Sequence, residues 1–127
     1  VFERTARFVI ETGIDLPRFA IQTPFPGTPL FARLDAEGRI LDRNWERYDG
    51  QHVVYRPAGM APAELQAGHE WAWREVYSLS SIGKRLAKAR TQLPLALLVN
   101  FGYRFYAYHL HSHYSCDWPM GYRSAAA

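Results

Sequence analysis

Cysteine is nearly absent from this chain. Among its 127 residues there is one, Cys116. A single thiol excludes an internal disulfide framework and any zinc site that needs several cysteines. It fits a reducing, cytoplasmic location, with association to a membrane as an open possibility. We expect Cys116 itself to be an inert, partly buried thiol.

Lysine is also scarce, although the chain is basic. Of its fifteen basic residues only two are lysines, and the net charge is +3. The charge is spread along the chain except for one run, formed by Lys84, Arg85, Lys88 and Arg90. This run predicts a solvated helix face, and contact with a phosphate, an anionic lipid or an acidic partner is the alternative. The sequence shows no P-loop or dinucleotide-binding glycine pattern, and we expect no nucleic-acid partner.

Long uninterrupted apolar runs are missing too. The longest apolar stretch, 93–110, is broken by Asn100 and Arg104 and is too short for a membrane-spanning helix. Its many aromatic residues favour packing against the rest of the chain. A peripheral contact with a membrane surface through 94–111 is the alternative.

The first residues predict alternating helix and strand. Apolar side chains at helical spacing predict a helix over 2–12, which Gly13 ends in a left-handed conformation. Residues 18–22 predict a buried parallel strand, because 19–21 are apolar on both faces. A second helix is expected from Pro29 to the residues before Gly38. This order is typical of α/β folds built on parallel sheets or barrels.

The turn between that strand and the second helix carries the clearest chemistry. In a barrel, groups that contact ligands lie at the carboxyl ends of strands, which here means Gln22 and Thr23. Pro24 stiffens the loop, and Gly27 allows close approach of the backbone. Thr28 marks a helix N-terminus that attracts a carboxylate or another oxygen-rich group. The alternative is a rigid turn without a ligand.

The remainder of the chain predicts a connector and then helices. Residues 39–61 are polar, with a short extended segment at 52–55. Residues 62–127 are expected to be mainly helical, with a break or kink at 80–83 and a last helix over 94–111. The packing seam of the first of these helices is predicted to consist of Leu65, His69, Ala72, Val76 and Leu79.

Histidines near the end of the chain allow a metal site as a minor alternative. His109, His111, His113 and Cys116 lie close in sequence, but a helix would separate His111 from the other two histidines. His52 and His69 are single, and we expect His69 to be a hydrogen-bonded core residue. No paired carboxylates are evident.

Two segments of the chain carry a resemblance to a known family. ARFVIETGIDLPRFAIQTPFPGTPLFARL, at 6–34, and DGQHVVYRPAGMAPAEL, at 49–65, are followed by a helical tail. Together they resemble radical S-adenosylmethionine enzymes, in particular the cobalamin-binding branch. The resemblance implies that 1–38 is the last helix–strand–helix of a partial TIM-like barrel, and that 62–127 is a C-terminal extension. The fold class expected is thus an α/β fragment followed by a mainly α-helical extension, with helix dominating.

The resemblance also implies a function for the parent protein. It would cleave S-adenosylmethionine reductively and transfer a radical or a methyl group to an unactivated carbon, with a 4Fe-4S cluster and a cobalamin as further cofactors. Gln22, Thr23, Pro24, Gly27 and Thr28 would help to bound the S-adenosylmethionine cavity. The family includes enzymes that act on lipid-like and tetrapyrrole substrates, and 94–111 is the segment that would contact a membrane surface or a lipid-like substrate.

The chain departs from the family in one decisive respect. A CxxxCxxC motif supplies three thiolates to the cluster, and one cysteine cannot replace them. We therefore expect this chain alone to be inactive and to hold no cofactor. Its partners would be the upstream barrel and cobalamin domain, encoded before Val1. The alternative is a non-catalytic helical module that binds a partner or a membrane surface.

Overall fold

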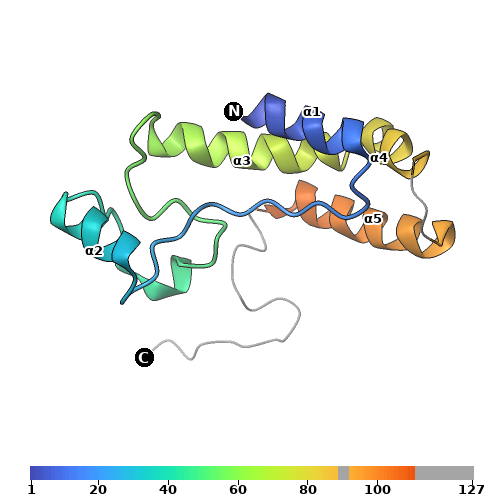
Figure 1. Cartoon of the computed structure of the whole chain (residues 1–127). Helices are drawn as coiled ribbons and strands as arrows, with labels where there is room; N and C mark the ends of the chain where they lie inside the picture. Colours follow the sequence, from blue (N-terminus) through green and yellow to red (C-terminus); the bar gives the residue numbers. More distant parts are fainter. Residues whose placement is uncertain (89–91, 111–127) are drawn as a thin grey trace. The chain divides into compact units, whose positions relative to one another are not determined.

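The chain is dominated by helix, as expected. A computed structural model describes residues 1–88 and 92–110 (Figure 1). In these ranges the helices are α1 (Phe2–Thr12), α2 (Pro29–Ala36), the short 3-10 helix η1 (Trp45–Arg47), α3 (Pro62–Val76), α4 (Leu79–Leu86) and α5 (Leu93–Tyr108). The described residues form two compact units. Unit 1 consists of Val1–Ala20 and Ala67–Leu110, and unit 2 of Ile21–Gln66.

The strand predicted at 18–22 does not form within the described residues. The described part of the chain contains no strand, only an isolated antiparallel bridge between Ile40 and Tyr55. Residues 18–22 are extended, and the Ile21 N–H donates to the Gly50 carbonyl at 2.6 Å. A strand is defined by a ladder of such bonds to a neighbour. Apolar side chains at 19–21 do not by themselves supply that neighbour. The extended segment expected at 52–55 contributes one residue, Tyr55, to the isolated bridge.

Helix α1 forms as the sequence predicts. Its apolar stripe buries Ala6 and Val9, and the helix packs against α4. Gly13 ends it with φ of 71°, a left-handed conformation that glycine adopts without steric cost. The N–H of Gly13 then bonds the Val9 carbonyl, which satisfies one of the free acceptors at the helix end.

Helix α3 buries most of its predicted seam. His69, Ala72 and Val76 are buried, together with Trp73, whereas Leu79 is 58% exposed. Leu79 leaves the seam because α3 ends at Val76 and a new helix begins. The side chain of Ser78 accepts the Ser81 N–H and thereby caps α4. The helix does break, but at 77–78, a few residues before the break or kink predicted at 80–83, and 80–83 lie inside α4.

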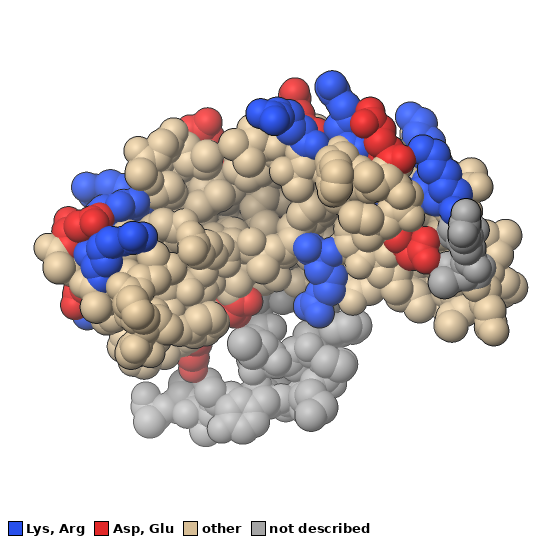
Figure 2. All heavy atoms as spheres, viewed as in Figure 1, with Lys and Arg blue, Asp and Glu red and all other residues tan. Residues whose placement is uncertain are grey.

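The basic run divides into exposed and buried members. Lys84 and Lys88 are exposed, and Figure 2 shows Lys and Arg side chains interspersed with Asp and Glu side chains over α1 and α4. Arg85 is completely buried, so the prediction of a solvated face is wrong for this residue. Arg90 lies outside the described residues.

Helix α5 begins one residue before Pro94 and ends at Tyr108. This confirms the predicted last helix but not its predicted end, since His109 and Leu110 follow α5. His111 lies outside the described residues. Within the described ranges, no helix is both long and apolar enough to cross a membrane. The buried side of α5 consists of small or polar residues, Ala96, Asn100 and Ala107.

Candidate functional site

The proline-rich turn in unit 2 adopts a tight, defined conformation. The Phe25 carbonyl accepts the Thr28 N–H at 3.1 Å, with Pro26 and Gly27 between them. Gly27 has φ of 81°, which is the geometry of a type II turn with proline and glycine at its central positions. A Cβ added at Gly27 would meet no atom within 4 Å. The glycine is thus required for backbone conformation, and close approach of another described segment does not explain it.

The two threonines of the turn are engaged in holding its shape. Thr28 donates its hydroxyl to the Phe25 carbonyl at 2.6 Å and accepts the Phe31 N–H at 3.2 Å. This confirms Thr28 as the N-cap of α2. Thr23 donates its hydroxyl to the Ile21 carbonyl at 3.1 Å. Both hydroxyls therefore act within the loop.

The other residues predicted at this site differ in their exposure. Pro24 is fully buried, whereas the side chain of Gln22 is exposed. At the start of α2, Pro29 has no N–H and the Phe31 N–H is taken by Thr28. Of the three residues 29–31, this leaves Leu30 as the one whose backbone N–H can serve a ligand. Gln22 and the Leu30 amide are consequently the groups of the turn best able to contact a ligand.

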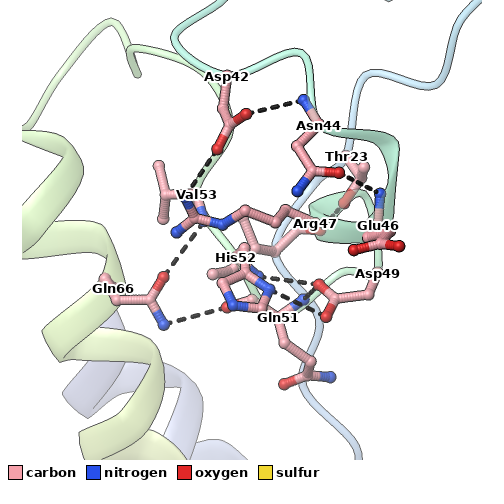
Figure 3. A network of polar contacts seen from close by, with 11 residues as sticks. Thr23, Asp42, Asn44, Glu46, Arg47, Asp49, Gln51, His52, Val53 and Gln66 are labelled. Atoms are coloured by element: carbon pink, nitrogen blue, oxygen red, sulfur yellow. Dashed lines mark hydrogen bonds and ion pairs between the residues drawn. The ribbon is translucent and has the colours of Figure 1, made fainter. Parts of the chain in front are cut away.

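A second loop in unit 2 holds a histidine against an aspartate. The Asp49 carboxylate accepts the backbone N–H groups of Gln51 at 2.8 Å and His52 at 3.1 Å. Its other oxygen lies 3.0 Å from Nδ1 of His52, and both side chains are largely buried. Figure 3 shows the two side chains beside each other. Such a pair fixes the orientation of the imidazole, as acid–base sites require.

Gln66 fastens this loop to the start of α3. Its amide nitrogen donates to the Gln51 carbonyl at 3.0 Å, and its amide oxygen accepts the Val53 N–H at 3.2 Å (Figure 3). The Gly50 carbonyl of the same loop accepts the Ile21 N–H. The loop that carries Asp49 and His52 is therefore tied to the residue that leads into the proline-rich turn.

A third group of polar residues surrounds Asp42. Its carboxylate accepts the Asn44 N–H at 2.8 Å and pairs with Arg47 at 2.7 Å. The Asn44 N–H, followed by the charge of Arg47, lowers the pKa of Asp42 below its ordinary value. Tyr48 donates its hydroxyl to the Asp42 carbonyl at 2.6 Å, and burial raises the pKa of this phenol. These contacts shape the segment before the Asp49 loop.

Sequence reasoning missed the Asp49–His52 pair because it treated His52 as single. The signal was present, since an aspartate three residues before a histidine and directly before Gly50 favours a turn closed by the carboxylate. His69, by contrast, is a buried residue whose Nε2 accepts the indole N–H of Trp73 at 3.1 Å, as expected for a core histidine. In the described ranges no group of His, Cys, Asp and Glu could hold a metal ion. His111, His113 and Cys116 lie outside those ranges.

Comparison with known proteins shows similarity to methyltransferases. The chain is 34% identical over 85 residues to the bacteriochlorophyllide d C-12(1)-methyltransferase of Chlorobaculum tepidum, which is 67% of this chain and 18% of that protein. It is 30% identical over 80 residues to the bacteriochlorophyllide d C-8(2)-methyltransferase of the same organism, which is 63% of this chain and 18% of that protein.

A third relative extends the similarity to another organism. An uncharacterised methyltransferase of Pyrococcus horikoshii is 39% identical over 46 residues, 36% of this chain and 10% of that protein. No protein-family model and no solved structure matches the chain. The chain is thus similar to methyltransferases over up to two thirds of its own length, and it spans less than a fifth of theirs.

Proposed function

We propose that this chain is the C-terminal part of a radical S-adenosylmethionine methyltransferase that acts on a substituent carbon of a tetrapyrrole. The observation that carries the proposal is the 34% identity over 85 residues to a bacteriochlorophyllide methyltransferase. The PFPGT turn and the order of segments around it support it, because they resemble the end of the radical S-adenosylmethionine barrel. In this proposal residues 1–38 complete the barrel, and 62–127 cover it.

The residues present do not fit the iron–sulfur cluster of such an enzyme. Three thiolates are needed, and the chain has one cysteine. The cluster and any cobalamin would therefore belong to the upstream barrel and cobalamin domain of the parent protein. This also predicts that anaerobic reconstitution of residues 1–127 with iron and sulfide yields no stoichiometric cluster absorbance. A bound four-iron cluster would contradict it.

S-adenosylmethionine bound in the parent protein would supply the radical by reductive cleavage of one molecule and the methyl group from a second molecule. In our proposal the turn of unit 2 forms one wall of its cavity. Gln22 and the Leu30 N–H offer a side-chain amide and a backbone donor to polar parts of the ligand. Thr23 and Thr28 hold the loop through their internal hydrogen bonds. Buried Pro24 anchors the loop in unit 2, and Gly27 provides its left-handed turn.

The test uses the full-length parent protein, purified without oxygen. We expect Gln22→Ala to reduce cleavage of S-adenosylmethionine to 5′-deoxyadenosine while leaving the melting temperature unchanged, because the side chain is exposed. Gly27→Val should lower the rate of S-adenosylmethionine cleavage by more than the loss of folded protein, judged from its melting temperature, accounts for. Ala63→Ser, at an exposed position of α3, is the control. If Gln22→Ala keeps full activity and Gly27→Val melts early with normal specific activity, the turn is only structural.

A helical interaction module without catalysis is the alternative function. The coding sequence before Val1 distinguishes the two. A CxxxCxxC motif upstream in the same reading frame supports the methyltransferase, and a nearby start codon without that motif supports the module.

A further inference from the structure

The loop from Asp49 to Val53 in unit 2, called here the 49–53 loop, is anchored on both sides. Tyr48 before it and Val54 after it are buried core residues. Inside the loop Gly50 is buried and has φ of 77°, a left-handed conformation that glycine adopts without steric cost. The two anchors and this glycine define the path of the loop backbone.

The carboxylate of Asp49 closes the first half of this loop. One oxygen, Oδ1, accepts both backbone bonds, from the N–H groups of Gln51 at 2.8 Å and His52 at 3.1 Å. An aspartate that accepts N–H groups two and three residues further on fixes a turn of the backbone. The side chain of Asp49 is only 5% exposed, so little water competes for these bonds. Asp49 therefore determines how the peptide groups between it and His52 are oriented.

The side-chain amide of Gln66 fixes the second half of the loop. As Figure 3 shows, it donates to the Gln51 carbonyl and accepts the Val53 N–H, so that one side chain bonds the loop backbone twice. A glutamate at this position can still accept from Val53, but it has no N–H to donate to Gln51. The substitution Gln66→Glu therefore removes one of the two bonds and nearly preserves the size of the side chain.

The 49–53 loop passes its orientation to the proline-rich turn through one carbonyl group. The Gly50 carbonyl lies between the residues that Asp49 bonds, and it accepts the Ile21 N–H at 2.6 Å. Ile21 is buried, it directly precedes Gln22, and its own carbonyl accepts the hydroxyl of Thr23. A change in the direction of the Gly50 carbonyl would therefore displace the residues that lead into the turn.

We propose that Asp49 and Gln66 are positioning residues, which act through the Gly50 carbonyl to hold Gln22 in place for its ligand. This inference rests on the function proposed above, in which Gln22 contacts S-adenosylmethionine. Small displacements of a group that positions a ligand cause large losses of activity. The part of Asp49 that matters is its ability to accept the two backbone N–H groups, and its negative charge is secondary.

Amide hydrogen exchange of residues 1–127 measures whether the two residues hold the turn. We expect Asp49→Ala and Gln66→Glu each to accelerate exchange of the Ile21 amide by at least about tenfold, because its acceptor is no longer fixed. Asp49→Asn should restore slow exchange, since its amide oxygen can accept the same two N–H groups. Glu64→Gln, at an exposed position of α3, is the matched control for Gln66→Glu and should leave the exchange unchanged.

Kinetics of the full-length parent protein, purified without oxygen, measure the effect on the ligand. We expect Asp49→Ala and Gln66→Glu to raise the KM for S-adenosylmethionine by about tenfold and to change kcat much less, because they alter a binding contact. Asp49→Asn should recover most of the lost affinity. Loss of folded protein alone would lower the measured kcat and leave KM unchanged.

Three results would overturn the proposal. The first is an Ile21 amide that exchanges as slowly in Asp49→Ala and Gln66→Glu as in the parent chain. The second is an unchanged KM in variants whose Ile21 amide exchanges faster. The third is an Asp49→Asn variant as impaired as Asp49→Ala, because the charge of the carboxylate would then be what matters. If the unsubstituted parent protein does not cleave S-adenosylmethionine, the function proposed above fails, and the exchange measurement still decides whether these residues hold the turn.

Discussion

The guanidinium of Arg85 donates to the side-chain oxygen of Asn100 at 2.8 Å, and both side chains are fully buried in unit 1. The same guanidinium donates to the carbonyls of Ile14, Asp15 and Val76. It thereby joins the segment after α1, the end of α3 and the middle of α5. Burial lowers the pKa of Arg85 below its ordinary value, so the hydrogen bonds are what make the buried cation tolerable.

We predict that Arg85→Ala destabilises the chain by about 3–5 kcal/mol, because it leaves several buried acceptors without a donor. That is a large share of the ~5–15 kcal/mol typical of a folded domain. Thermal and urea unfolding measure the change. Lys84→Ala, one residue earlier and exposed, is the control and should be nearly neutral. A variant at Arg85 that melts like the parent chain would contradict a central role for this guanidinium.

Substitutions on opposite sides of α3 test its buried seam. Val76 is fully buried, and Val76→Asp would place an unpaired carboxylate in the core of unit 1. We expect this variant to unfold or aggregate, as judged by circular dichroism and size-exclusion chromatography. Arg74, two residues before it, is exposed, so Arg74→Ala should behave like the parent chain. Equal effects of both substitutions would mean that the seam is assigned to the wrong face.

The parts of the fold that sequence predicted best depend on local signals. Helix α1 with its end at Gly13 and helix α2 with its cap at Thr28 follow from periodicity and capping residues. The strand at 18–22 failed because pairing depends on a neighbour that local sequence does not specify. The sequence prediction placed the break between α3 and α4 too late, because it relied on the glycine at 83. The break lies instead before α4, where the side chain of Ser78 caps the helix.

Among the functional residues, too, roles set by nearby residues were predicted and roles set by distant partners were not. Thr28 was predicted correctly as a cap, because its role depends on residues within one turn. Arg85 was assigned to a solvated face, although its partners Ile14 and Asn100 lie far away in sequence. Charge patterns predict which side chains prefer water. They do not predict which cation finds enough acceptors in the core.

Gly27 and Gly59 form a matched pair for testing the proline-rich turn. A Cβ would meet no atom within 4 Å at either position, but only Gly27 has a positive φ. Gly27→Ala should therefore destabilise the chain by about 1–2 kcal/mol through backbone strain alone. Gly59→Ala should be neutral or slightly stabilising, because it restricts the unfolded chain. Urea unfolding of both variants checks this, and equal stabilities would exclude the type II turn as the reason for Gly27.

The carboxylate of Asp42 gives a prediction about pH. The Asn44 N–H and the charge of Arg47 lower its pKa in the folded chain, so folding favours the ionised form. The stabilisation is present at neutral pH, and it is lost as the pH falls below about 4, where the carboxylate gains a proton. The melting temperatures of the parent chain and Asp42→Asn should thus differ at neutral pH and converge in acid.

A second variant separates the two causes of this shift. The Asn44 N–H is the largest single contribution, and Arg47 contributes both its charge and a side-chain hydrogen bond. In Arg47→Gln the carboxylate keeps its backbone hydrogen bond, so part of the pH-dependent difference from the Arg47→Gln, Asp42→Asn double variant should remain. Calorimetry between about pH 3 and pH 7 measures both differences. If the difference in melting temperature between a chain and its Asp42→Asn variant stays constant over this pH range, the charge of Asp42 does not stabilise unit 2. If the pH-dependent difference disappears in Arg47→Gln, Arg47 is the dominant partner of Asp42.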